Sequence, residues 1–177
     1  MRLSKSFTLN ELTKSQTAER EGINNNPSGD QIERLQRLCE NILQPVRDHY
    51  GTPVVVSSGF RSGQLCIKVG SSINSQHAKG EAADFEIFGI SNQELAHWID
   101  KNLDYDQLIL EFWNPEDKNS GWIHCSYKSP EENRKEFLRA YRNESGKVCY
   151  EKYSYIKYAG EQPTQEEVNS MYADKGV

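Results

Sequence analysis

The sequence predicts an α+β fold in which a small antiparallel sheet is covered by helices on one side. Three observations indicate this class. Apolar residues recur every three or four positions over residues 30–49, which is typical of a helix that buries one face. The β-branched run Val54–Ser58 is typical of a buried strand. Two further apolar runs, 106–112 and 121–127, are separated by a polar turn and predict a hairpin with a longer loop.

Length and charge exclude several classes of partner. A chain of 177 residues has the size of one domain and can bury a sizeable core. The formal net charge is -5 without a basic block, which argues against nucleic-acid binding because that needs clustered Lys and Arg. No apolar run approaches the ~20 residues that span a bilayer, so we expect no membrane partner. Residues 1–8 lack the apolar core of a signal peptide, so we expect synthesis in a cytoplasm.

The N-terminal third predicts an arm and one long helix. Residues 1–29 are turn-rich, and Thr8 with Glu11 has the pattern of a capping box at the start of a short helix. This segment should pack on the domain as an arm. The helix over 30–49 follows, and Pro45 should kink its C-terminal end or close it there.

The elements that follow Val54–Ser58 are short. Residues 63–69 suit a short helix, and residues 70–74 form a flexible loop. The run 82–87 predicts a strand, and 91–102 predicts a second helix that Ser91 caps. Near the C-terminus, residues 147–158 alternate and hold four tyrosines, which indicates a strand or hairpin arm.

The cysteines predict neither disulfides nor a structural metal site. The four residues are widely spaced and form no CxxC pair. We expect reduced thiols, in keeping with cytoplasmic synthesis. They are Cys39, Cys66, Cys125 and Cys149.

One stretch carries the clearest chemical signal. His77 and Asp84 lie seven residues apart, and Gly80 between them allows a sharp turn because it has no Cβ. Asp84 belongs to the predicted strand 82–87, and His124 lies on the return strand of the predicted hairpin. A catalytic zinc ion is typically bound by three such ligands, here two imidazoles and one carboxylate. Its fourth position stays open for water. A lone His is more often a hydrogen-bonded core or surface residue, and this is the role that we expect for His97.

Several motifs, in combination and in order, resemble the zinc D-Ala-D-Ala carboxypeptidase family of peptidases. The similarity is to the small single-domain variety common in bacteriophage genomes, and it covers about residues 5–142. The segments that carry it are Phe7–Leu12, Gly22–Pro27, Ser57–Ser62, Ser75–Asp84 and Trp122–Tyr127.

The resemblance implies a hedgehog/DD-peptidase-like fold and a zinc metallopeptidase. His77, Asp84 and His124 would bind Zn²⁺, and the substrate would be a peptidoglycan stem peptide. The bond cleaved would be the terminal D-Ala-D-Ala bond or an internal L-Ala-D-Glu bond, as in endolysins. Arg61 would stabilise the oxygen of the scissile carbonyl or of the tetrahedral intermediate, a task that suits the fixed charge and planar donors of guanidinium.

The catalytic carboxylate departs from the common family pattern. Many members carry it three residues before the last His, where this chain has Gly121. The phage-type variety instead has a Glu at the end of the preceding strand, and Glu111 fits that position. A catalytic base must lie within reach of the attacking water, which favours Glu111. Glu81 and Glu86 are the alternatives.

Strand alternation indicates which side chains meet the substrate. Trp122, His124 and Ser126 share one face of their strand, and this face should line the site. We therefore expect Trp122 and Ser126 to bind substrate together with Arg61 and Ser75. The Ser75 hydroxyl is equally suited to stabilising a turn.

The predicted organisation is a peptidase-like domain with its N-terminal arm over residues 1–142, followed by a Tyr-rich extension and polar tail over 143–177. By resemblance residues 133–142 form the last strand of the domain, although periodicity alone also allows a helix. The enzyme would act at the cell wall after release from the host cytoplasm, or as part of a virion. An alternative is a non-catalytic virion or tail component that keeps the fold for structure or wall binding and has virion proteins as partners.

Overall fold

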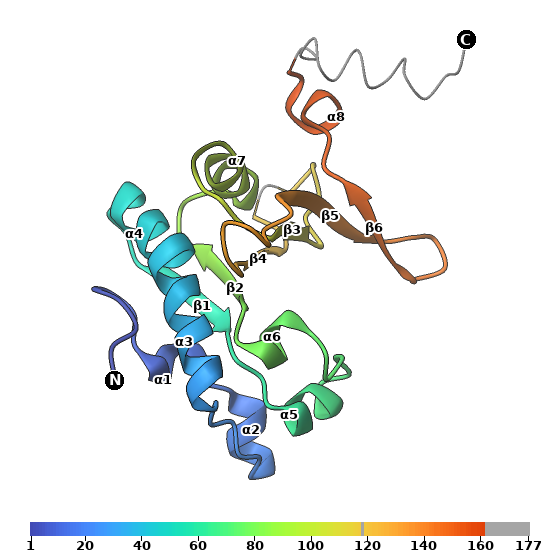
Figure 1. Ribbon diagram of the computed structural model, residues 1–177. Coiled ribbons are helices and arrows are strands. Elements are labelled where there is room, and N and C mark those ends of the chain that lie inside the picture. The colour runs from blue at the N-terminus through green and yellow to red at the C-terminus, as the bar shows by residue number, and fades with distance from the viewer. Residues whose placement is uncertain (118, 162–177) are drawn as a thin grey trace.

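A six-stranded sheet in the order β1-β2-β4-β3-β5-β6 forms the frame of the molecule (Figure 1). The structure is a computed structural model, and it describes residues 1–117 and 119–161. The strands are β1 (Val54–Ser58), β2 (Ala82–Ile87), β3 (Gln107–Glu111), β4 (Trp122–Ser126), β5 (Glu136–Arg142) and β6 (Val148–Lys152). The predicted α+β class is confirmed, and so is the predicted hairpin, formed by β3 and β4.

One strand pair departs from the expected antiparallel arrangement, because β5 runs parallel to β3. After β4 the chain returns past the start of β3, where the Lys135 and Glu136 amides donate to the carbonyls of Tyr105 and Asp106. β5 therefore begins beside the start of β3 and runs in the same direction. The sheet is mixed for this reason.

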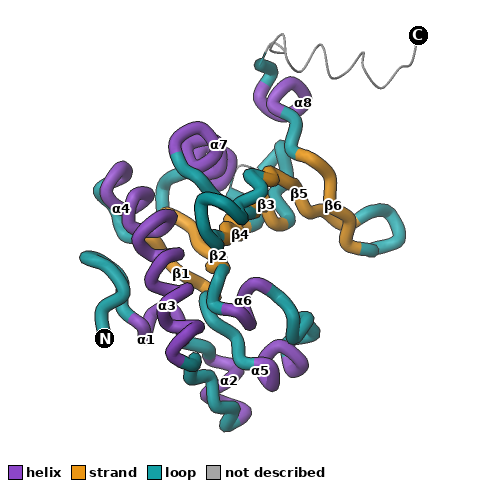
Figure 2. The backbone as a smooth tube through the Cα atoms, viewed as in Figure 1, coloured by secondary structure: helices purple, strands orange, loops and turns teal. Residues whose placement is uncertain are grey.

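Helices cover one face of the sheet, and short helices border the other. In Figure 2, the α3–α4 run and α7 lie along one side, whereas α5 and α6 lie on the opposite side. No helix in the described ranges combines the length and apolar character required to cross a bilayer. The helical segments are α1 (Leu9–Thr13), α2 (Gln16–Glu21), α3 (Gly29–Leu38), the π-helical η1 (Cys39–Leu43), α4 (Gln44–Tyr50), α5 (Gly63–Lys68), α6 (Gln76–Lys79), α7 (Asn92–Asn102) and α8 (Tyr155–Ala159).

Of the two outcomes predicted for Pro45, a kink or an end of the helix, the end is wrong, because the helix continues past the proline. The helical run continues to Tyr50, and the π-helical turn η1 ends at Leu43, two residues before the proline. Proline lacks an N–H and its ring clashes with the carbonyl of residue i−4. In the wider π turn the bonds reach one residue further back, as when the Gln44 amide donates to the Cys39 carbonyl. The wide turn accommodates Pro45 without ending the helix.

The core lies between the sheet and the covering helices. Side chains alternate along each strand, so every second residue of β2, β3 and β4 enters this core. The strand residues buried there include Ala83, Phe85, Leu108, Leu110, Ile123 and Cys125. The helical residues packed against them include Leu35, Leu38, Ile42, Leu95 and Ile99. The intervening strand residues face the opposite side, which is left open for the polar residues described below.

The sheet continues across the expected boundary after residue 142. Arg142 of β5 pairs with Val148 of β6. Tyr153, just beyond β6, stacks on Phe137 with ring centroids 4.3 Å apart, and its hydroxyl accepts from Gln93 of α7. The segment 148–159 thus packs against the same core as the preceding strands. The predicted tail lies beyond residue 161, outside the described residues.

Candidate metal centre and active site

The fold brings His77, Asp84 and His124 together from two strands and one short helix. The β2–β4 register places Asp84 directly opposite His124. His77 lies on α6, which ends at Gly80 with a φ of 77°. A Cβ at Gly80 would lie 2.7 Å from the Gln31 carbonyl oxygen, so only glycine fits this turn into β2.

The three side chains offer ligand atoms that all lie within 4.8 Å of one another. Asp84 Oδ1 is 3.3 Å from His77 Nε2 and 3.0 Å from His124 Nδ1. All three residues are buried. Two imidazole nitrogens and one carboxylate oxygen form a donor set that suits zinc.

The electrostatics keep Asp84 ready to bind a cation. Burial by itself would raise the pKa of the carboxyl, but His77 and His124 lower the pKa well below its usual range. Asp84 is therefore ionised at neutral pH, as a metal ligand must be.

Two of the three candidate ligands are oriented by a neighbour on the side away from the cluster. His77 Nδ1 lies 2.7 Å from the Gly59 carbonyl oxygen and donates to it, so Nε2 is the nitrogen that faces Asp84 and would bind a metal. Arg61 Nη2 donates to Asp84 Oδ2 over 2.9 Å, and Arg61 Nε donates to Ser58 Oγ over 2.8 Å. Such outer contacts are typical of residues that hold a metal.

Glu111 shares a cavity of about 610 Å³ with the cluster. It ends β3 opposite Trp122, on the face that carries His124. Burial raises its pKa, and the charge of Asp84 adds to this effect while His124 opposes it. Neither alternative carboxylate lines the cavity: Glu86 accepts from Asn92, and Glu81 lies 3.9 Å from Arg34.

Three of the four predicted substrate-binding residues line this cavity: Arg61, Ser75 and Trp122. Ser75 also caps α6, because its hydroxyl accepts from the Ala78 amide. Ser126 does not line the cavity. It points to the expected face but is fully buried there, and its hydroxyl accepts from the Gln107 amide.

The other two histidines lie away from the cluster. His97 Nε2 is 2.7 Å from the Tyr153 hydroxyl, and His49 stacks on Trp98. Both are packing contacts of α7, in keeping with the structural role predicted for His97.

Sequence reasoning missed several residues that line the cavity, among them Gln76, Lys128, Arg134 and Tyr150. Tyr150 comes from β6 and is 57% exposed. The alternation of β6 indicates that Tyr150 shares a face with Lys152, but no local pattern shows which strand lies beside it. For Gln76, its position next to His77 in the sequence was the signal that could have indicated a place in the site.

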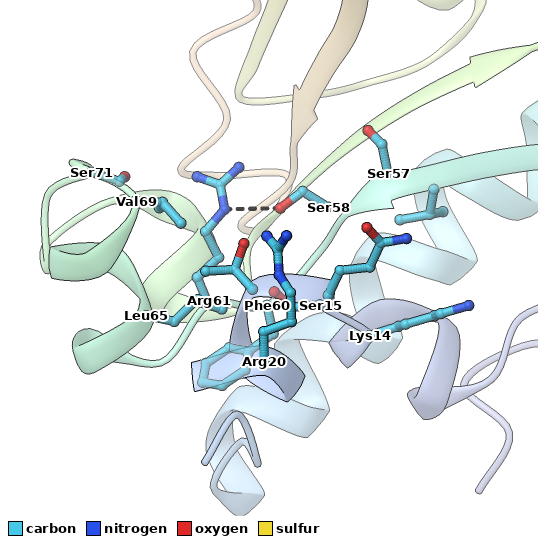
Figure 3. A pocket seen from close by; sticks show the side chains of 13 residues that line it. Lys14, Ser15, Arg20, Ser57, Ser58, Phe60, Arg61, Leu65, Val69 and Ser71 are labelled. Carbon is cyan, nitrogen blue, oxygen red and sulfur yellow. Dashed lines mark hydrogen bonds between the residues drawn. The ribbon is translucent and has the colours of Figure 1, made fainter. Parts of the chain in front are cut away.

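A second cavity of about 570 Å³ adjoins the first and shares Arg61 and Ser71 with it. Figure 3 shows the guanidinium groups of Arg20 and Arg61 pointing the same way within it. Its charged lining residues are Lys14, Arg20 and Arg61, with no carboxylate among the described residues that line it. The lining of this second cavity therefore favours an anionic group beside the His77, Asp84 and His124 cluster.

Comparison with known protein families gives a match. A family model described as Peptidase M15 matches residues 5–126. No curated protein matches the chain. The matched span contains the His77, Asp84 and His124 cluster and both Arg61 and Glu111, whereas β5 and β6 lie outside it.

Proposed function

Because the chain belongs to the peptidase M15 family, we propose that it is a zinc-dependent peptidase that cleaves a peptide bond in peptidoglycan stem peptides. The observation that carries the proposal is the convergence of His77, Asp84 and His124 in a cavity that also holds Glu111 and Arg61. The motifs are similar to those of phage enzymes, so the proposed setting is a bacteriophage-encoded protein that acts at the bacterial wall.

Each residue has a role that follows from its surroundings. Zn²⁺ held by the cluster would polarise the scissile carbonyl and lower the pKa of a water molecule. Glu111 takes a proton from the attacking water and delivers it to the leaving amine, and its raised pKa suits both transfers. Arg61 keeps donors beyond those bound to Asp84 and Ser58, and these stabilise the negative oxygen that develops on the substrate.

The second cavity, which is lined by basic side chains, would orient the substrate relative to the metal site. A stem peptide carries free carboxylates, and Arg20 with Lys14 would pair with one of them next to Arg61. The substrate would then lie across Arg61, with its reacting carbonyl in the larger cavity. Both the D-Ala-D-Ala and the L-Ala-D-Glu bond satisfy this arrangement.

The test combines metal content with product analysis. Elemental analysis of purified protein should give about one zinc per chain, and His77→Ala should lose it. Mass spectrometry of muropeptides after digestion should show either released D-Ala or new amino termini at D-Glu. Zinc-loaded protein that releases neither product would reject the proposal and favour the non-catalytic virion component.

A further inference from the structure

His124 differs from the other two ligands in the kind of neighbour that orients it. Its Nδ1 faces Asp84 Oδ1, whereas its Nε2 lies 3.4 Å from Oε1 of Gln76. A glutamine amide can turn either end towards a histidine, and its two ends impose opposite protonation on the ring. The contact therefore defines the state of His124 only if something holds the Gln76 amide in one orientation.

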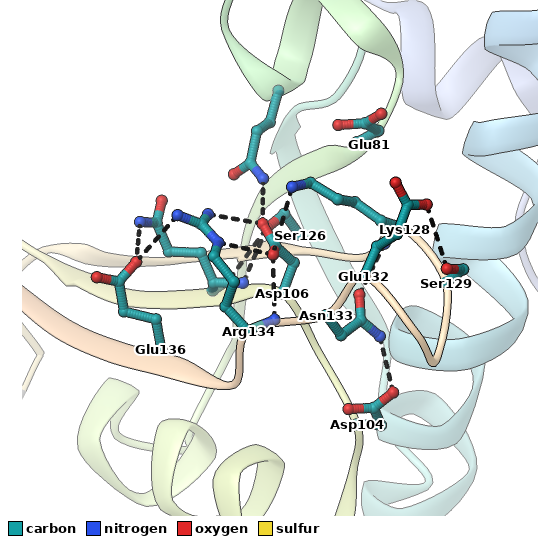
Figure 4. Close-up of polar contacts among 12 residues, drawn as sticks. Glu81, Asp104, Asp106, Ser126, Lys128, Ser129, Glu132, Asn133, Arg134 and Glu136 are labelled. Carbon is teal, nitrogen blue, oxygen red and sulfur yellow. Dashed lines mark hydrogen bonds and ion pairs between the residues drawn. The ribbon is translucent and has the colours of Figure 1, made fainter.

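Asp106 supplies that constraint. Gln76 Nε2 donates to Asp106 Oδ2 over 2.6 Å. Asp106 is fully buried, and Figure 4 shows Arg134 reaching both of its oxygens, with contacts of 2.8 Å from Nε and 2.7 Å from Nη2. Lys128 Nζ lies 3.6 Å from the same carboxylate.

Asp106 remains ionised in this setting. Burial would raise its pKa, but hydrogen bonds from Arg134 and Gln76 outweigh burial and hold the pKa at about 2. An ionised carboxylate only accepts hydrogen bonds, so the Gln76 –NH₂ group must face it.

The order of donors and acceptors then follows along the chain of contacts. With its –NH₂ on Asp106, Gln76 presents Oε1 to His124 and accepts from Nε2–H. Nδ1, which lies 3.0 Å from Asp84 Oδ1 in the cluster, is then the nitrogen available to a metal, and metal binding displaces the proton that Nδ1 shares with Asp84 while Nε2–H stays on Gln76.

We propose that Gln76, held in one orientation by Asp106 and Arg134, is the positioning residue that sets the tautomer and ring angle of His124 for metal binding. This inference rests on the proposed zinc function. It gives a functional role to Arg134, which lies outside the span matched by the family model. The competing explanation is purely structural: the bond between Gln76 and Asp106 would only fasten α6 to the start of β3.

Zinc affinity separates the two explanations. Gln76→Met keeps the length and volume of the side chain but removes the oxygen that faces His124. It should therefore weaken zinc binding about 10- to 100-fold, the range found when a hydrogen-bond partner of a metal ligand is lost. Affinity is measured by competition with a chromogenic chelator. The matched control is Gln107→Met, because Gln107 lines the same cavity and donates to the Glu136 carboxylate but faces no ligand. Thermal unfolding of both metal-free variants shows that each is folded.

A reversal of the hydrogen-bond order gives a second readout. Gln76→Glu alone sets two carboxylates against each other and should bind zinc more weakly than wild type. Adding Asp106→Asn supplies a donor to the new carboxylate, which then accepts from His124. The double variant should therefore recover affinity to within a few-fold of wild type. A merely structural role of the bond predicts that, across these variants, zinc affinity changes only in step with the thermal stability of the metal-free protein.

The outcomes separate this inference from the proposed function. Zinc-binding, active wild-type protein with unchanged affinity in Gln76→Met would reject the positioning role alone. Equal losses in Gln76→Met and Gln107→Met would also reject it, as would a double variant no better than either single one. Wild-type protein that binds zinc but cleaves no peptidoglycan would reject the proposed function, while the affinity series would still decide the role of Gln76.

Discussion

Burial and charge act in opposite directions at the carboxylates of this protein, and the balance gives each its role. Asp84 and Asp106 are buried beside positive partners or hydrogen-bond donors, so their pKa values are lowered and they stay ionised. Glu111 has more burial than compensation, so its pKa is raised. These protonation states suit the roles proposed for the three carboxylates: a metal ligand, a fixed acceptor and a proton carrier.

Replacing Glu111 should remove catalysis without removing the metal. Glu111→Gln keeps the shape of the side chain but cannot accept the proton, so we expect kcat to fall about 10²- to 10⁴-fold. Zinc content should be unchanged. In wild type, kcat/KM should fall as the pH drops through the raised pKa of Glu111, because the base must be ionised. Glu86→Gln is the control, since Glu86 is exposed and outside the cavity; equal losses in the two variants would contradict the assignment.

Asp106 should contribute to stability in acid. Its pKa is lowered from 3.8 to about 2 in the folded state, so the unfolded chain takes up the proton first as the pH falls. The contribution is complete above about pH 4 and is lost between pH 4 and 2, and it is on the order of 2 kcal/mol. Urea unfolding of metal-free protein at a series of pH values measures it. Asp106→Asn should flatten this part of the stability curve; a slope that stays as steep in the variant would contradict the prediction.

Among the elements, the β3–β4 hairpin explains where the proposed catalytic carboxylate is located. Gly121 precedes β4 with a φ of 69°, and a Cβ there would lie 2.0 Å from the Glu111 carbonyl oxygen. No side chain fits at this position without moving β3. A carboxylate three residues before His124 is therefore sterically excluded, and the end of β3 supplies one instead.

Gly121→Ala should damage both stability and activity. The clash is with backbone atoms, and the positive φ adds strain, so we expect a loss of about 3 kcal/mol or more. Peptidase activity should fall as well, because Glu111 is displaced. Gly146→Ala is the matched control: its φ is 79°, but nothing lies within 4 Å of the added Cβ, so it reports strain alone. Similar chemical denaturation midpoints for the two variants would show that the clash is relieved.

Over the whole molecule, the active face is assembled from both ends of the sheet. Arg61 follows β1 at one edge, and Tyr150 belongs to β6 at the other. The N-terminal helix α2 adds Arg20 to the adjoining basic cavity. The proposed substrate contacts thus extend well beyond the candidate metal site, and the affinity for substrate should respond to residues far from the reacting bond.

Arg20→Gln should raise KM about tenfold or more and leave kcat nearly unchanged. A hydrogen-bonded charge pair between Arg20 and a substrate carboxylate contributes about 1.5–3 kcal/mol, and this contact is the same in the ground and transition states. Steady-state kinetics on a stem peptide measures the effect. The control is the same peptide with its carboxylates amidated, on which wild type and variant should not differ; a KM difference that persists there would contradict a carboxylate contact.

Much of the fold and the three residues of the candidate metal site could be predicted from the sequence, because both depend on local patterns. Helical periodicity, strand alternation and cap residues indicated the α3–α4 run, β2 and α7 close to their observed bounds. The spacing of His77, Gly80 and Asp84 indicated a turn at Gly80 that brings Asp84 back close to His77. Glu111 was preferred for its place at a strand end, and the structure puts it in the cavity.

Residue types, their spacing and the amphipathic periods of single elements are properties of the chain, and they determined the fold class and the set of candidate ligands. The tertiary structure alone decided that β5 runs parallel to β3, that Ser126 is covered while Tyr150 enters the cavity, and that Asp106 orients Gln76. These outcomes depend on which distant segments pack together. Such packing is decided by the summed burial and hydrogen bonding of the whole molecule, which no single segment encodes.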